Sequence, residues 1–158
     1  MKYSEKYNSE RYLDMTAYLA LKNIERKNPN MNEDWIYRRG DIYLANLDPF
    51  IGSEQGGTRP VVVLQNNAGN YFSPTLIVAP ITSRCDKRRD LPTHYYVEST
   101  RGLDGPAIVL LEQLKTIDKR RVRKYIGKMS VRQVEDMGDI IEQTVGNACR
   151  IPECEEAP

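Results

Sequence analysis

The sequence lacks the residues on which several classes of enzyme depend. Among its 158 residues there is one histidine, His94, and one tryptophan, Trp35. A ribonuclease that uses two histidines as acid and base is therefore excluded within one chain. The three cysteines form no C-x-x-C pair and have no histidine near them, which argues against a zinc site and a disulfide framework. No cluster of Asp, Glu and His resembles a two-metal nuclease, so we expect no metal and no cofactor.

Long hydrophobic runs and an excess of one charge are also missing. The apolar runs, such as 61–64 and 107–111, are far too short to cross a bilayer, and the polar N-terminus has no secretory segment. We expect a cytoplasmic protein with no membrane partner. The formal net charge of +1 gives no global sign of nucleic-acid binding. Basic residues gather in 84–89 and 115–128, which are either solvated loops or, if they flank one cleft, a surface that attracts phosphate.

Composition divides the chain into three parts. Residues 1–34 are polar and carry apolar residues at helical spacing, namely Leu13, Ala17, Ala20, Leu21 and Ile24. This spacing predicts an amphipathic helix that ends at Pro29 and is followed by a linker to Trp35. Residues 35–150 form the main domain. Residues 151–158 form an acidic tail, which we expect to be disordered.

Residues 38–129 show short strands separated by turns. The strand candidates are 41–45, 61–65, 75–81, 95–97, 107–112 and 124–129. Residues 66–73 contain Asn and Gly and predict a turn. Strands at this spacing, with no long helices between them, indicate a small antiparallel barrel or curled sheet.

A helix is predicted to follow the strands, which makes the fold mainly β with helices (α+β). Ser130 begins this C-terminal helix, and Gln133 completes a capping box. The apolar stripe that would face the sheet consists of Val134, Met137, Ile141 and Val145.

The most informative segment is Gly52–Pro60, a glycine-rich polar loop that runs into a buried strand. Glycines allow positive φ and a close approach of the backbone to a ligand. Arg59 lies at the junction of loop and strand, where Pro60 restricts its backbone, and a guanidinium held there suits a phosphate. Two structural interpretations stay open at this point. The glycine pair can simply join two strands, and the arginine can cap a carbonyl or pair with a carboxylate.

Polar residues also stand at the ends of other core strands. Thr82 follows the apolar run 76–81, and Glu112 and Gln113 follow 107–111. With Arg59 they could converge on one mouth of a barrel, a common place for ligands. A threonine at a strand end is more often a turn or β-propensity residue. His94 lies beside a strand, and we interpret it as structural.

Together these blocks resemble the MazF/PemK family of toxins in their order and spacing over residues 38–146. The blocks are 39–43, 52–63, Asn66, Asn70, 73–75, 81–82, 91–94 and 110–119. The resemblance implies an SH3-like (CcdB-like) barrel that forms a two-fold homodimer. It also implies a cognate antitoxin whose C-terminal segment covers the RNA groove. Residues 1–34 depart from the family pattern, and their helix would pack across the dimer, shield the groove or act as a regulatory element.

The resemblance implies metal-independent, sequence-selective cleavage of single-stranded RNA, which inhibits translation and growth. The ribose 2′-hydroxyl attacks the adjacent phosphate and leaves a 2′,3′-cyclic phosphate and a 5′-hydroxyl. By this resemblance the catalytic arginine is Arg59 and the catalytic threonine is Thr82. Glu54 is the nearest plausible carboxylate for a general base, or it positions Arg59 or reads a base. DNA has no 2′-hydroxyl and would not be cleaved.

Further candidates for RNA contact are Ser53, Gln55, Gly56, Gly57, Tyr43, Phe50, Asn70, Glu112 and Gln113. Polar side chains in this set would bond base edges, and the rings of Tyr43 and Phe50 would stack on bases. Because fold does not fix function, a gyrase poison of the related fold and a catalytically silent RNA- or partner-binding module are the alternatives. The gyrase poisons rely on a tryptophan near the C-terminus, whereas Trp35 lies near the other end. The intact Arg59 and Thr82 motifs favour the nuclease.

Overall fold

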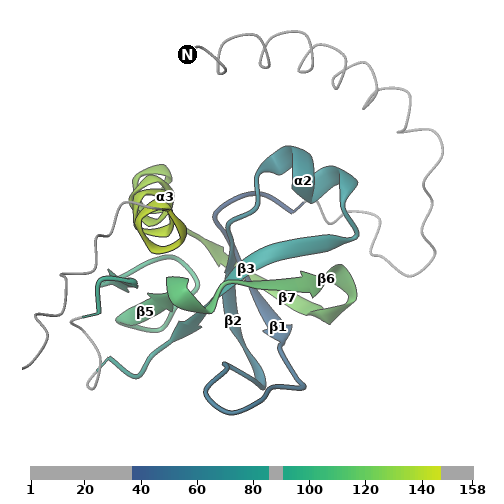
Figure 1. The fold of residues 1–158 in the computed structure, drawn as a ribbon, viewed down its shortest axis with the longest axis horizontal. Coiled ribbons are helices and arrows are strands. Elements are labelled where there is room, and N and C mark those ends of the chain that lie inside the picture. The colour runs from purple at the N-terminus through teal and green to yellow at the C-terminus, as the bar shows by residue number, and fades with distance from the viewer. Residues whose placement is uncertain (1–36, 86–90, 147–158) are drawn as a thin grey trace, which may run out of the picture. The chain divides into compact units, whose positions relative to one another are not determined.

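The antiparallel pattern predicted from the sequence forms a seven-stranded sheet followed by one long helix (Figure 1). The computed structural model describes residues 37–85 and 91–146, so the predictions for 1–34 and 151–158 lie outside the described residues. The strands are β1 (Asp41–Asn46), β2 (Thr58–Val63), β3 (Thr75–Thr82), β4 (His94–Val97), β5 (Ala107–Leu110), β6 (Lys115–Asp118) and β7 (Val122–Lys128). The helices are α2 (Asn67–Phe72) and α3 (Val131–Val145), with 3₁₀ turns η1 (Leu111–Gln113) and η2 (Lys119–Arg121). None of the helices within 37–85 and 91–146 is long and apolar enough to cross a membrane.

β3 lies at the centre of the sheet and pairs with three other strands. β2 lies along one edge, followed by β1 and β7. The other edge is shared by β6, at the start of β3, and β5, at its end. Val78 pairs with Lys115, and Ile81 pairs with Val109. The two β3 residues are three positions apart in the sequence, whereas their partners are six positions apart. The three extra residues are those of η1, which therefore bulges from this edge.

The apolar core lies between the sheet and α3. Its buried members are Ile42, Val62, Leu64, Ala79, Ile81, Val97, Ala107, Val109, Leu111, Met129 and Met137. The predicted capping box is confirmed: Ser130 Oγ accepts the Gln133 N–H, and Gln133 Oε1 accepts the Ser130 N–H at 2.7 Å. Val145, predicted to face the sheet, is exposed, and Ile140 packs against the core instead.

Two other segments differ from the prediction. The expected turn at 66–73 contains the short helix α2, because Asn66 acts as an N-cap whose Oδ1 accepts the Gly69 N–H at 2.8 Å. The basic segment 115–128, expected as a loop up to residue 123, contains β6 and the start of β7. β6 pairs with β3, and tertiary pairing of this kind outweighs a locally polar composition.

Candidate active site

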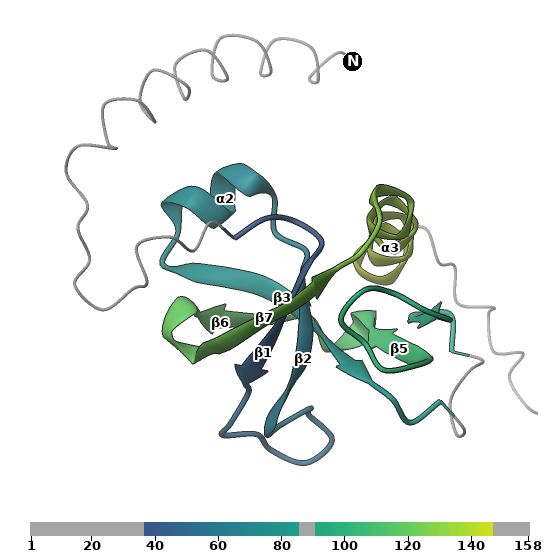
Figure 2. The same ribbon diagram turned by 180° about the vertical axis from the view of Figure 1, so that it is seen from behind.

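The glycine-rich segment is a loop that joins β1 to β2, at the end of these strands opposite to α2 (Figures 1 and 2). Gly52 and Gly57 have φ values of 57° and 73°, a region that other residues rarely adopt. Phe50 and Ile51 are 50% and 81% exposed. The loop therefore buries little apolar surface of its own, and polar bonds to the rest of the fold must hold it.

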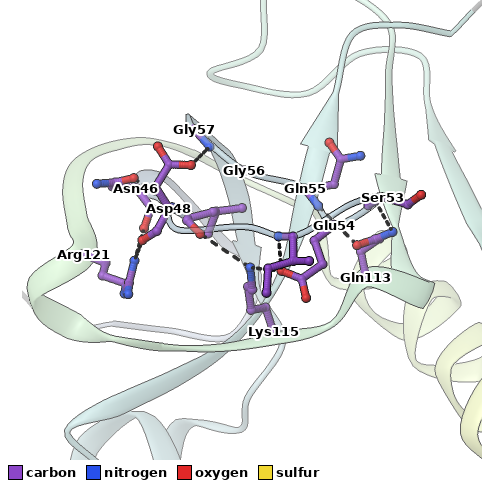
Figure 3. Close-up of polar contacts among 12 residues, drawn as sticks. Asn46, Asp48, Ser53, Glu54, Gln55, Gly56, Gly57, Gln113, Lys115 and Arg121 are labelled. Carbon is purple, nitrogen blue, oxygen red and sulfur yellow. Dashed lines mark hydrogen bonds and ion pairs between the residues drawn. The ribbon is translucent and has the colours of Figure 1, made fainter.

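The neck of the loop, where it leaves β1 and enters β2, is closed by main-chain and side-chain bonds. Asp48 Oδ1 accepts the Gly57 N–H at 2.6 Å, and the Leu47 N–H donates to Gly57 O at 2.9 Å. The Arg121 guanidinium, from η2, donates to the carbonyls of Asn46, at 3.3 Å, and Asp48 (Figure 3). A permanently charged donor shared by two carbonyls ties the neck to η2.

The tip of the loop is held from the other side by η1 and β6. Gln113 Nε2 donates to Ser53 O at 3.3 Å, and Gln113 Oε1 accepts the Gln55 N–H at 3.4 Å. Lys115 Nζ lies 3.5 Å from Glu54 Oε2 (Figure 3). The segment from η1 to η2 therefore contacts the loop at its tip and at its neck.

Arg59 is half-buried near the start of β2, and residues of the loop fix its guanidinium. Its Nε donates to Gly56 O at 2.6 Å, and its Nη1 donates to Gln55 Oε1. A Cβ on Gly56 would lie 1.9 Å from the Phe50 ring, so the ring covers this glycine. Gly56, which we predicted as an RNA contact, therefore gives its carbonyl oxygen to Arg59. Nε and Nη1 are thus engaged by the loop, and neither of these two bonds uses Nη2.

Thr82 ends β3 and is partly exposed. Its hydroxyl oxygen accepts the Arg84 N–H at 3.2 Å. The β2–β3 register runs from Val63 opposite Val78 to Val61 opposite Pro80. Arg59 and Thr82 each lie two residues beyond the last pair of this register, where Arg59 pairs with Ala45 of β1 and Thr82 with Ile108 of β5. The two residues predicted as catalytic therefore stand near the start of β2 and at the end of β3, two strands that pair with each other.

Glu112 and Gln113 lie in η1, but their side chains have different partners. Glu112 Oε1 lies 3.1 Å from His94 Nε2, and the His94 side chain is 2% exposed while that of Glu112 is 30% exposed. Gln113 bonds the loop tip. His94 thus has the structural environment that the sequence suggested, and it holds Glu112 at the surface.

Two of the predicted RNA contacts, Tyr43 and Asn70, are buried in the structure. Tyr43 is 4% exposed, its hydroxyl donates to Asp41 Oδ2 at 3.2 Å, and its ring packs against Tyr37 and Tyr125. Burial, with a smaller contribution from the Asp41 carboxylate, raises the pKa of Tyr43 well above its usual range. Asn70 is 2% exposed in α2, and its Nδ2 donates to Gln65 O at 3.0 Å. Neither side chain has a face open to a base.

The basic cluster 115–128 has several distinct roles. Lys119 is buried, with its Nζ donating to Asn70 O and lying 5.3 Å from the centre of the Tyr37 ring. Arg120 bonds Asp118, and this hydrogen bond holds the pKa of the Asp118 carboxyl below its usual value. Lys115 and Arg121 hold the loop, a role that their position in a basic run did not reveal. Among the described residues no group of three or more His, Cys, Asp or Glu side chains is placed to hold a metal ion.

Residues 38–145 match the family described as PemK-like, MazF-like toxin of type II toxin-antitoxin systems. The chain is 46% identical over 110 residues to Endoribonuclease MazF of Staphylococcus saprophyticus, which covers 69% of this chain and 91% of the relative. It is also similar to the solved Mycobacterium tuberculosis toxin MazF-mt6, with 26% identity, a TM-score of 0.55 and coverage of 66% and 94%. A MazE–MazF crystal structure (form II) from Deinococcus radiodurans matches in fold, with 24% identity, a TM-score of 0.55 and coverage of 70% and 96%.

Proposed function

Because this chain belongs to the PemK-like, MazF-like toxin family of type II toxin-antitoxin systems, we propose that it is an endoribonuclease that cuts single-stranded RNA, mRNA included, at selected short sequences and without a metal ion. Cleavage of mRNA inhibits translation and growth in the cytoplasm. The active form is a homodimer. A cognate antitoxin is its second partner and covers the RNA groove with a C-terminal segment, while DNA alone is not a substrate.

The orientation of Arg59 is the observation that carries this proposal. Attack of the ribose 2′-oxygen on phosphorus gathers extra negative charge on the non-bridging oxygens. A guanidinium held in advance by Gly56 O and Gln55 Oε1 stabilises that charge in the transition state more than in the ground state. The P–O5′ bond then breaks, and the 5′-oxygen takes a proton from solvent. The products are a 2′,3′-cyclic phosphate and a 5′-hydroxyl.

Thr82 and Glu54 complete the proposed chemistry. The Thr82 hydroxyl, whose oxygen already accepts the Arg84 N–H, has its proton free to donate to a phosphate oxygen and to hold the in-line geometry. The Glu54 carboxylate takes the proton of the 2′-hydroxyl as general base. Glu54 pairs with Lys115, whereas Gln55 and Gly56 orient Arg59, so we no longer assign Glu54 the alternative task of positioning the arginine.

Base selection is assigned to side chains at the rim of this site. Ser53 is exposed in the loop, Phe50 presents a half-exposed ring for stacking, and Glu112 presents a carboxylate fixed by His94. Gly57 lies in the same loop, and its N–H donates to Asp48 Oδ1. Gln55 bonds the Arg59 guanidinium, and Gln113 bonds the loop backbone at Ser53 and Gln55.

The test is cleavage of a long, mostly unstructured RNA in EDTA with mapping of the 5′ ends. We expect discrete cuts at one short motif with 5′-hydroxyl ends, and at least about a hundredfold slower cleavage by Arg59→Ala. Arg132→Ala, an exposed arginine of α3, is the matched control and should cut like wild type.

A substrate with a single 2′-methoxy group at the cut site should resist cleavage there only, because it lacks the nucleophile. Cleavage of that substrate at the same bond would refute the mechanism. A folded wild-type protein that cuts no RNA in EDTA would refute the proposed function.

A further inference from the structure

We propose that Gln113 is a positioning residue for Arg59, and that it acts by holding the tip of the β1–β2 loop. This inference rests on the proposed function and assigns Gln113 a task other than reading a base. Both ends of its side-chain amide already bond the loop backbone: Nε2 to Ser53 O at 3.3 Å, and Oε1 to the Gln55 N–H at 3.4 Å (Figure 3).

The reach of Gln113 follows from the bulge in the sheet. Lys115 and Val109 are both paired with β3, and η1 lies between them as an insertion of three residues. Because an inserted segment is displaced from the ladder, Gln113 leaves the edge of β3 and meets the loop. Leu111, in the same turn, is fully buried in the core, so the turn that carries Gln113 is itself anchored.

Arg59 depends on the loop for its orientation. In the described part of the chain both side-chain bonds of its guanidinium go to loop residues, Gly56 and Gln55. Gln113 holds Ser53 O and the Gln55 N–H. The Gln55 side chain and the Gly56 carbonyl come directly after these groups along the chain. A shift of the loop tip would therefore move both acceptors of the guanidinium at once.

The other bonds to the loop act on its neck or on an exposed side chain. Asp48 Oδ1 accepts the Gly57 N–H, which belongs to the same peptide unit as Gly56 O, and the Arg121 guanidinium in turn bonds the Asp48 carbonyl. The Glu54–Lys115 pair is at the tip, but its charged groups are substantially exposed, and pairs of that kind contribute little. Gln113 is thus the link from η1 to the loop tip, beside the link that Asp48 and Arg121 provide at the neck.

The first test uses the free protein and no RNA. The Arg59 Nε–H, identified by its loss in Arg59→Lys, should give a distinct nitrogen–proton signal with slow solvent exchange in wild type, because it bonds Gly56 O. In Gln113→Ala this signal should move toward the position of solvent-exposed arginines and exchange faster. Gln143→Ala, an exposed glutamine of α3, should leave it unchanged.

The second test is single-turnover cleavage at the mapped site. Gln113→Ala should lower kcat by about ten- to a hundredfold, with KM changed far less, because displacement of a catalytic group by about 1 Å has an effect of that size. The order of preference among substrates with altered bases should stay the same. In a Gln55→Ala background, Gln113→Ala should have a much smaller effect, because the two residues act on the same arginine.

The outcomes separate this inference from the proposed function. If wild type cuts RNA but Gln113→Ala leaves both kcat and the Arg59 signal unchanged, the positioning role is wrong. If Gln113→Ala changes the base preference and leaves the Arg59 signal as in wild type, Gln113 reads a base instead. A loss of all cutting by wild type overturns the proposed function, while the Arg59 signal still decides whether Gln113 orients the arginine.

Discussion

The buried imidazole of His94 contacts Glu112 of η1, with 3.1 Å between His94 Nε2 and Glu112 Oε1. The Glu112 side chain is 30% exposed. The contact joins β4 to the turn that bulges from the sheet. It fixes a partly exposed carboxylate while the ring itself is buried. His94 therefore links the packing of the core to the surface that we propose selects the base.

Removing the histidine should lower stability. We expect His94→Ala to reduce the free energy of unfolding by about 1 to 3 kcal/mol, because it leaves a cavity and frees Glu112. Urea denaturation at neutral pH measures this value. Glu112→Ala removes the same contact without a cavity and should cost less. An equal or larger loss in Glu112→Ala would show that the contact, and not the packing of the ring, dominates.

The general base can be separated from the ion pair it forms. Glu54→Gln keeps the size of the side chain and an acceptor for the Ile51 N–H, which lies 3.2 Å from Glu54 Oε2, but it cannot take a proton. We expect cleavage at neutral pH to slow by about 10²- to 10⁴-fold. Stability should change by less than about 1 kcal/mol, because the pair is exposed.

Lys115→Met is the matched variant for that measurement, since it breaks the pair with Glu54 and leaves the carboxylate. Its rate should stay much closer to wild type. If both variants lose activity equally, the carboxylate is not the base and the pair acts only on the loop.

The buried tyrosines should make the protein sensitive to alkali. Burial raises the pKa of Tyr37 to about 12 and that of Tyr43 further. The unfolded chain then loses these protons first, at its ordinary tyrosine pKa near 10. Stability contributed by Tyr43 is therefore complete below about pH 10 and is lost as the pH rises toward the folded-state value, by up to about 1.4 kcal/mol per pH unit for each such tyrosine.

Urea denaturation of wild type and Tyr43→Phe at about pH 8 and about pH 11 measures this loss. Tyr43→Phe should lose less stability between the two values than wild type does. Tyr96→Phe, at an exposed tyrosine, should follow wild type. Parallel losses in all three proteins would contradict the assignment to Tyr43.

A methyl group on Gly56 should disturb the site without blocking it directly. The added Cβ would lie 1.9 Å from the Phe50 ring, so the ring or the backbone must move, and the Gly56 carbonyl that orients Arg59 moves with it. We expect Gly56→Ala to slow cleavage by about ten- to a hundredfold. Gly105→Ala, where the added Cβ meets nothing within 4 Å, is the control. Wild-type activity in Gly56→Ala would show that the Phe50 ring moves aside without a shift of the Gly56 carbonyl that bonds Arg59.

Local sequence was sufficient to predict much of this architecture. The β-branched runs predicted β2 and β3, and Ser130 with Gln133 predicted the start of α3, because strand propensity and helix capping depend on neighbouring residues. The prominence of Arg59 followed from the glycines before it and Pro60 after it. That it catalyses the reaction stays a prediction.

Contacts between distant segments escaped prediction for a physical reason. Gln113 and the Gln55 N–H are 58 residues apart, and their meeting depends on the bulge at η1, which no local pattern encodes. Tyr43 alternates with Ile42 along β1, yet both are buried. The register of β1 on β7 shifts between them, and Tyr37 and Tyr125 cover the second face, so a simple rule of alternating exposure fails there.

The three-residue bulge at η1 also bears on how this protein can be re-engineered. Deleting Leu111–Gln113 would bring β5 and β6 into phase along β3 and give a more regular sheet edge of the kind that designers build, although it would also remove the buried Leu111 from the core. The same deletion would remove the carboxylate at the rim and the amide that holds the loop. Idealising the scaffold and preserving the proposed site are therefore opposed goals at this one turn, and stabilising changes belong elsewhere in the sheet.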